Sequence, residues 1–250
     1  MPAPRQVCCT WGVAHDAFPP SGSARLAAAA HAIVSCNRCP RLRSYCERIA
    51  REKRAAYRQD TYWGRPVPGF GDPDARIVLV GLAPAAHGAN RTGRIFTGDG
   101  RGGSGDFLMA ALHAAGLANQ PFSHALDDGL QLHDVWMAAS VRCAPPDNKP
   151  SPEEIAECYP HLTAELQALP RAQVLVALGA LAFNTCWKVL GDRGRPRQKK
   201  PPFEHGGVFT QRESLSVVMS YHPSRQNTHT GRLTPAMLRE ACATAMSLVR

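Results

Sequence analysis

Long apolar runs are missing from this 250-residue chain. No segment approaches the roughly 18 consecutive apolar residues that a membrane-spanning helix needs. The first residues, Met1 to Cys9, lack the apolar stretch of a secretory signal. The chain also contains no internal repeat and no extended low-complexity tract. These absences argue against membrane-spanning, secreted and repeat-built proteins, and we expect a soluble intracellular protein.

Aromatic and acidic residues are also scarce. Aromatic side chains make up 7% of the chain, and 20 acidic residues face 29 Lys and Arg, which gives a net charge of +9. Sheets that bind nucleic acid by stacking bases carry exposed aromatic rings, so this composition argues against such a module. The positive charge favours a polyanionic partner without deciding whether that partner is nucleic acid. Hydrophobic residues supply 44% of the chain, enough for a sizeable core.

Four short apolar runs alternate with segments of helical composition. The runs cover residues 76–82, 134–141, 173–179 and 215–221, and the helical segments cover residues 104–116, 151–168 and 180–190. This alternation is typical of a parallel sheet with helices on both faces. The sequence therefore predicts an α/β protein with three layers, α/β/α, around a central four-stranded parallel sheet. Residues 1–24 are interpreted as a loosely packed arm and residues 25–250 as one domain.

Each apolar run is followed by a loop rich in polar residues. These loops begin at Ala83, Arg142, Ala180 and His222. In open parallel sheets, ligands bind beyond the carboxyl ends of the strands. The sequence therefore predicts that its chemistry lies at this edge of the sheet.

The nine cysteines form an odd set in a chain expected to be intracellular, which favours metal ligation or scattered thiols over a disulfide framework. Cys36 and Cys39 form a C-x-x-C pair in a turn between two predicted helices, and Cys143 and Cys158 are the preferred partners. Four thiolates suit zinc and an iron–sulfur cluster equally well by ligand type. Cys46 is a possible competitor as fourth ligand. The remaining cysteines are interpreted as core or surface thiols.

Three long motifs follow the predicted strands in order. Gly81 to Asp99 reads GLAPAAHGANRTGRIFTGD, Val141 to Pro150 reads VRCAPPDNKP, and His222 to Thr234 reads HPSRQNTHTGRLT. Together with the C-x-x-C pair they resemble the first motif, the cysteine-bearing loop and the second motif of family 5 uracil-DNA glycosylases, also called type B. The matching segments extend from residue 36 to residue 234.

The resemblance implies a monofunctional DNA glycosylase that removes uracil, and with some tolerance other deaminated bases, from single- or double-stranded DNA. It implies a monomer in the cytoplasm, at the nucleoid of a prokaryotic cell. It also makes zinc the minority interpretation, because the family carries a 4Fe-4S cluster. The ligands implied are Cys36, Cys39, Cys143 and Cys158.

The same resemblance assigns roles in the site. Phe96 is expected to stack on the flipped base, and His222 to donate a hydrogen bond to the departing uracil, whose charge develops as the bond breaks. Asn90 and Asn148 are candidates for holding the water or the base edge, with Asp99 a weaker candidate that could equally cap the helix near Ser104. The other expected substrate contacts are Gly81, Ala83, Pro84, Ala85, Ser224 and Arg225.

Ala83 departs from related glycosylase families, where this position or its neighbour carries a polar or acidic residue that positions water. Another group must therefore help, or loosely held water must capture the sugar. The small side chains of Ala83 and Ala85 also leave room for purine analogues such as hypoxanthine.

Basic residues are expected to hold the DNA phosphates near the mouth of the site. The candidates are Arg91, Arg94, Arg101, Arg225 and the strip 193–200, which could equally be a solvated basic loop. Two rival functions remain at this point: a non-catalytic metal-cluster protein that only binds nucleic acid, and a redox protein that does not account for the histidine motif.

Overall fold

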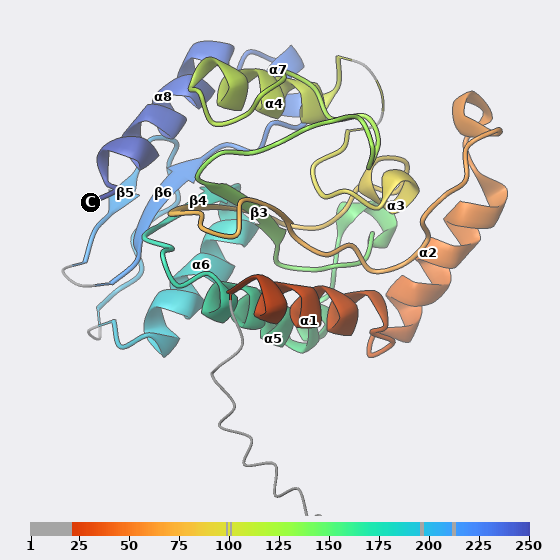
Figure 1. Ribbon diagram of the computed structural model, residues 1–250, viewed down its shortest axis with the longest axis horizontal. Coiled ribbons are helices and arrows are strands. Elements are labelled where there is room, and N and C mark those ends of the chain that lie inside the picture. Colours follow the sequence, from red (N-terminus) through yellow and green to blue (C-terminus); the bar gives the residue numbers. More distant parts are fainter. Residues whose placement is uncertain (1–21, 99, 101, 196–197, 212–213) are drawn as a thin grey trace, which may run out of the picture.

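The computed structural model describes residues 22–98, 100, 102–195, 198–211 and 214–250 (Figure 1). The predicted arm, residues 1–24, lies mostly outside this part of the chain. Its last three residues already belong to helix α1 (Gly22–Val34). Helix α1 therefore begins three residues before the predicted boundary.

Four parallel strands form the centre of the sheet, as predicted. They are β2 (Ile77–Gly81), β3 (Val135–Ala139), β4 (Val174–Leu178) and β6 (Ser216–Ser220), and all are fully buried. The order across the sheet is β1-β3-β2-β4-β6-β5. The prediction is corrected at the two edges, where β1 (Phe70–Gly71) and β5 (Val208–Phe209) pair antiparallel with β3 and β6.

The helices cover both faces of the sheet, which confirms the predicted three layers (Figure 1). Alternate strand residues enter two apolar clusters, for example Leu79 on one face and Val80 on the other. Helices α4 (Ser104–Ala114) and α8 (Pro235–Ser247) pack on the first face. Helices α1, α5 (Pro152–Ala168) and α6 (Ala180–Asp192) lie on the second.

Shorter helices lie at the carboxyl edge of the sheet. They are α3 (Ala89–Thr92), α7 (Arg225–His229) and the 3-10 turn Pro146–Asn148. Helix α2 (Pro40–Glu52) follows the cysteine-bearing turn after α1 and leads to the 3-10 turn Ala55–Tyr57. None of the described helices has both the length and the apolar character needed to cross a bilayer.

The strand order has a reversal next to β2. The chain passes from β2 to its neighbour β3, and then to β4 on the other side of β2. Ligands of open α/β sheets bind in the crevice beyond such a switch point. The loop that follows β2 is therefore the place to look for a site.

Candidate active site

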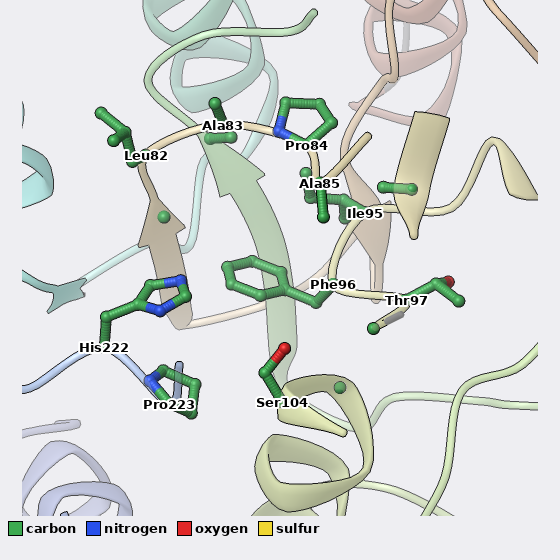
Figure 2. Close-up of a pocket in the computed structure, with 15 residues that line it drawn as sticks. Leu82, Ala83, Pro84, Ala85, Ile95, Phe96, Thr97, Ser104, His222 and Pro223 are labelled. Carbon is green, nitrogen blue, oxygen red and sulfur yellow. The ribbon is translucent and has the colours of Figure 1, made fainter. Parts of the chain in front are cut away.

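A pocket lies at the carboxyl edge of the sheet, between three segments (Figure 2). The loop after β2 supplies Leu82 to Ala85, and the pair His222 and Pro223 follows β6. The third wall comprises residues 95–98 and the first turn of α4. Loops after two strands that are separated by β4 thus meet at one cavity, as the sequence predicted for this edge.

Phe96 lies in the middle of this pocket with a left-handed backbone, φ 57°. Its ring packs on the end of β2, where a Cβ added to Gly81 would lie 2.8 Å from the Phe96 Cζ atom. The left-handed region costs a bulky residue free energy and persists only where the surroundings enforce it. An aromatic residue whose backbone is strained, at the centre of a cavity, is consistent with a functional role.

His222 faces Phe96 across the cavity (Figure 2). Its carbonyl oxygen accepts hydrogen bonds from the Ser224 N–H and the Asn227 Nδ2, both at 2.8 Å. Gly179, which follows β4, has φ +99° and leaves the space beside the His222 Cβ without a side chain. Burial lowers the pKa of His222 to about 4. The imidazole is therefore neutral at physiological pH and can donate through one ring N–H.

The structure brings together many of the residues expected to contact substrate. Those that line the pocket are Gly81, Ala83, Pro84, Ala85, Phe96 and His222. Ser224 and Arg225 lie just beyond it, where Ser224 Oγ accepts the Asn227 N–H at the start of α7. Asp99 lies outside the described residues.

Asn90 is placed beneath the pocket and does not line it. Its side chain is completely buried, and its Nδ2 donates to the carbonyl oxygens of Cys46 and Ala86, both at 3.3 Å. The amide therefore joins helix α2 to the loop that carries the pocket wall. The Asn90 Oδ1 is buried and has no hydrogen-bond partner in the described part of the chain, and the expected contact with water or a base edge stays a prediction.

Asn148 is likewise separate from the pocket. It is exposed in the 3-10 turn after Cys143 and has φ 56° beside Asp147 with φ 53°. Asn and Asp tolerate the left-handed conformation better than other non-glycine residues. Asn148 does not line the pocket, and its expected role in holding the water or the base edge stays a prediction.

Ser104 is a pocket residue that the sequence reasoning treated only as a helix start. It begins α4, and Figure 2 shows its hydroxyl directed toward Phe96. The helix can approach so closely because Gly98 and Gly105 pack backbone to backbone, with a Gly98 Cβ position 2.7 Å from the Gly105 N atom. The signal in the sequence was the Gly-Gly-Ser-Gly run itself.

Two arginines expected at the phosphates are instead committed within the protein. Arg94 is 2% exposed and pairs with Asp128, with its guanidinium over the Phe70 ring. Arg91 pairs with Asp60 at 2.7 Å and lies over the Tyr57 ring. Their charges hold the first motif in place. Arg101 lies outside the described residues.

The basic strip 193–200 starts at the edge of the sheet opposite the pocket, so its first residues cannot contact the pocket mouth. Helix α6 begins after the carboxyl end of β4 and its 13 residues span about 20 Å. Arg193 consequently lies beside Gln173 and Ser216, at the start of β4 and β6. The strip then returns along α6, where Lys200 contacts Asn184 at 2.6 Å. Residues 196–197 lie outside the described residues.

The four cysteines proposed as ligands line a second cavity. Cys36 and Cys39 come from the turn between α1 and α2, Cys143 from the loop after β3, and Cys158 from α5. Cys46, the competitor, is fully buried in α2 and is not among the residues that line this cavity. The structure thus assembles the set of thiols that the sequence favoured.

Several interactions hold this cavity together. Arg41 pairs with Glu154 through two hydrogen bonds of 2.8 and 2.7 Å, which joins the start of α2 to the start of α5. The Arg142 N–H donates to Cys158 Sγ at 3.2 Å, and the Arg38 Nε to Cys36 Sγ at 3.4 Å. Hydrogen bonds to sulfur are a common means of tuning a bound cluster.

The four thiols can be compared with the ligand geometry that a single zinc ion needs. Tetrahedral zinc at about 2.3 Å from each sulfur would bring the sulfurs to within about 4 Å of each other. Among the described residues, no three Cys, His, Asp or Glu side chains converge in this way on one ion. Burial raises the pKa of Cys39, and that of Cys158 to about 12, so a cationic group bound here would favour the thiolate forms. Four thiols around one cavity form a ligand set that an iron–sulfur cluster could use.

The two cavities share a wall. Ala83 and Ala86 of the pocket loop pack against the apolar cluster that contains Cys46, Cys143 and Cys158. The Asn90 bond to the Cys46 carbonyl adds a polar link. The cysteine cavity is therefore positioned to support the loop after β2.

Comparisons with known proteins agree with this geometry. A family model described as the uracil DNA glycosylase superfamily matches residues 68–245. The type-5 uracil-DNA glycosylase of Thermus thermophilus is 48% identical over 216 residues, 86% of this chain and 94% of that protein. The type-5 protein of Pyrobaculum aerophilum is 46% identical, covering 83% and 86%. A type-4 uracil-DNA glycosylase of Archaeoglobus fulgidus is 30% identical over 63% of this chain and 70% of that protein.

Proposed function

The chain belongs to the uracil DNA glycosylase superfamily, within it to the type-5 proteins, and from this premise we propose that it is a monofunctional uracil-DNA glycosylase. It hydrolyses the N-glycosidic bond of uracil in DNA and leaves an abasic site. The observation that carries the proposal is the facing pair of Phe96 and His222 in one cavity at the switch point of the sheet. A protein that only binds nucleic acid has no need of such a pocket.

Uracil must leave the base stack to reach this pocket. Extrusion costs a few kcal/mol and is cheapest at a mismatched pair. The Phe96 ring provides a stacking surface worth about 1–3 kcal/mol per base. Because stacking does not choose among bases, the edge of the base must be read by other groups in the cavity.

His222 stabilises the leaving group. As the bond between the sugar C1′ and uracil N1 breaks, the electron pair goes to uracil and negative charge develops on its carbonyl oxygen. A neutral imidazole N–H fixed at that oxygen opposes the charge as it appears. The sugar cation is then captured by water, whose oxygen bonds to C1′ and whose proton is released to solvent.

Ser104 is the second polar group available to substrate. Among the described pocket residues only Thr97, Ser104 and His222 have polar side chains, and the Thr97 hydroxyl contacts Ser123 at 3.3 Å. We assign the Ser104 hydroxyl to the water or to the base edge. It supplies part of what the Ala83 position lacks.

A 4Fe-4S cluster held by Cys36, Cys39, Cys143 and Cys158 is part of this proposal. When bound, it would connect the turn between α1 and α2, the loop after β3 and helix α5 through its bonds to the four sulfurs. The protein's own residues carry out the reaction at the other cavity. The support is the common cavity of the four thiols and its shared wall with the pocket.

The range of substrates is also proposed. Ala83 and Ala85 leave space at one wall of the pocket, which suits hypoxanthine and other deaminated bases besides uracil. We propose that the protein acts as a monomer, on single- or double-stranded DNA, in the cytoplasm where a prokaryotic cell keeps its DNA.

Cleavage of end-labelled DNA tests the proposal. Duplexes carrying uracil, hypoxanthine or normal bases are incubated with the protein and treated with alkali, which breaks the strand at abasic sites. We expect breaks at uracil and none at normal bases. His222→Ala should lower the single-turnover rate about 10²–10³-fold while DNA affinity changes little. Wild-type protein that leaves uracil intact in all duplexes would disprove the function.

A further inference from the structure

Two buried side chains at the cysteine cavity carry polar nitrogens without a partner. Arg142 is 1% exposed and His161 8%, and both line this cavity. The Nε and Nη1 atoms of Arg142 and the Nε2 atom of His161 have no hydrogen-bond partner among the described residues. A buried donor without a partner costs free energy, and proteins satisfy nearly all such groups. These nitrogens therefore indicate that a group bound in the cavity accepts hydrogen bonds.

Both side chains come from the elements that supply two of the cysteines. Arg142 directly precedes Cys143 in the loop after β3, and its backbone N–H donates to Cys158 Sγ at 3.2 Å. His161 follows Cys158 by three positions in α5, a spacing that places two residues on the same face of a helix. The unpartnered nitrogens and the proposed cluster ligands therefore border one space.

Arg142 is held in place by a buried ion pair. Its Nη2 donates to Glu165 Oε2 at 2.6 Å, and Glu165 Oε1 accepts the Gly69 N–H at 2.8 Å. Both charged side chains are almost completely buried. Because a guanidinium is a rigid plane with donors on all three nitrogens, the bond through Nη2 also fixes the orientation of Nε and Nη1.

The charges around the cavity favour an anionic occupant. Arg38, Arg43 and Arg142 line it, together with one acidic residue, Glu157. A 4Fe-4S core bound by four thiolates carries net negative charge, which increases when the cluster is reduced. Positive charge and hydrogen bonds to the sulfurs therefore favour the reduced form. Since Glu165 offsets the charge of Arg142, hydrogen bonding is the main effect expected of this arginine.

We propose that Arg142, through Nε and Nη1, and His161, through Nε2, donate hydrogen bonds to the sulfur atoms of the 4Fe-4S cluster and raise its reduction potential. The inference rests on the cluster that is part of the proposed function. It adds two positioning donors to the four cysteines. Neither residue lines the pocket that contains Phe96 and His222, so their effect is on the cluster and not on the glycosidic bond.

The reduction potential of the cluster tests the proposal. It is measured by titration of anaerobic protein, followed by visible absorbance and by EPR of the reduced form. His161→Phe keeps a planar ring without the donor, so its potential should be more negative than that of wild type. A tenfold weaker preference for the reduced form corresponds to about 59 mV for one electron. His161→Gln retains an N–H donor and should stay closer to wild type.

A second variant examines Arg142 without leaving one buried charge unpaired. Arg142→Gln alone would strand the Glu165 carboxylate inside the protein, which is strongly destabilising. The double variant Arg142→Gln/Glu165→Gln removes both charges together with the donors at Nε and Nη1. Its potential should also shift to a more negative value.

His113→Phe is the matched control. His113 is exposed near the end of α4, which packs on the face of the sheet opposite α5, so its potential should equal that of wild type. Iron content and melting temperature are measured for every variant. A purely structural role changes these two quantities and leaves the potential of the loaded protein unchanged. Wild-type potentials in both His161→Phe and the double variant would therefore overturn the proposal.

Nitrogen coupling to the cluster tests the wild-type protein itself and does not depend on the folding of a variant. Protein labelled with nitrogen-15 in its histidine rings is frozen and irradiated, which reduces the cluster whatever its potential. Pulsed EPR should then detect a histidine nitrogen coupled to the cluster, because His161 lines the cavity. Absence of this coupling, or zinc in place of iron, would overturn the proposal. Wild type that shows the coupling but leaves uracil intact would refute the glycosylase activity alone.

Discussion

The ring of Phe96 rests on the bare backbone of Gly81, 15 positions earlier in the chain. A Cβ at Gly81 would lie 2.8 Å from the Phe96 Cζ and 3.1 Å from its Cε1. Both distances are too short for carbon atoms in contact, so only glycine at the end of β2 allows the ring to occupy the centre of the pocket. The relationship connects a backbone position to the stacking surface for the base.

Gly81→Ala should therefore displace the Phe96 ring. The far end of a side chain can move, so we expect little change in melting temperature but at least a 10-fold lower cleavage rate, comparable with the stacking energy lost. The double variant Gly81→Ala/Phe96→Ala should be no slower than Phe96→Ala alone, since both changes remove the same contact. Gly191→Ala in α6, where a Cβ meets nothing closer than 3.7 Å, serves as control. Additive losses in the double variant would contradict this explanation.

The state of His222 can be checked by pH. Burial lowers its pKa to about 4, below the value of about 6.5 for an unfolded chain. Between about pH 6.5 and pH 4 the unfolded state therefore binds a proton at His222, whereas the folded state does not. This difference lowers the stability of the folded protein progressively as pH falls through that window. We expect the free energy of unfolding of His222→Gln to fall less than that of wild type between pH 7 and pH 5, measured in urea.

NMR of protein labelled with nitrogen-15 in its histidine rings measures the protonation state of His222 directly. The resonance of His222 is the one that is missing from the spectrum of His222→Gln. The His222 ring should remain neutral at pH 5.5. A ring that becomes protonated near pH 6.5 would contradict the assignment of a neutral donor.

The cysteine cavity predicts iron in the purified protein. Protein prepared without oxygen should be brown, with broad visible absorbance, and Cys158→Ala should bleach it and lower the melting temperature because three distant segments lose their connection. Cys186→Ala is a suitable control, since Cys186 is buried in the apolar cluster on one face of the sheet. Stoichiometric zinc without iron would refute the cluster.

Much of this architecture was predictable from sequence. The four central strands are buried on both faces, so each appears in the sequence as a continuous apolar run. The loops after β2 and β6 were correctly expected to meet at one edge, whereas helix α6 begins at Ala180, directly after β4, where a polar loop was expected. Strands β1 and β5 have two residues each, too few to produce a pattern. Helix α8 was missed although Thr234 caps it and Pro235 occupies its first position, because these residues adjoin a motif that had been interpreted as a loop.

The pocket itself was harder to predict in its details. Arg94 is neutralised by Asp128, 34 positions away, and no local spacing reveals such a pair. Ser104 enters the pocket only because two glycines let α4 approach the loop. Motifs therefore indicated which segments form the site, while tertiary packing decided which side chains of those segments face the substrate.

Asn90 illustrates the difference and can be tested. If Asn90 contacts the water or the base directly, Asn90→Ala should lower the cleavage rate and leave the free energy of unfolding unchanged. If Asn90 is instead the buried link to the Cys46 and Ala86 carbonyls, Asn90→Ala should lower the free energy of unfolding by about 1–3 kcal/mol. The cleavage rate per folded molecule should then fall less than 10-fold. Urea denaturation and single-turnover cleavage of one preparation decide between the two. A normal stability with a rate reduced 100-fold would restore the catalytic role.

Salt dependence locates the DNA-binding surface. Each phosphate that a side chain neutralises contributes about 0.9 to the slope of log affinity against log salt. Arg225 is exposed at the start of α7, three residues after His222, so Arg225→Gln should reduce that slope by about 1. Arg193 lies beside Gln173 and Ser216 at the opposite edge of the sheet, so Arg193→Gln should leave the slope unchanged although the lost charge is the same.

Affinity for a uracil duplex is measured from about 50 to 200 mM salt. Because both variants change the net charge equally, a smaller slope in both would reveal a general charge effect. A smaller slope for Arg193→Gln alone would place the DNA beside Arg193, at the edge of the sheet opposite the pocket.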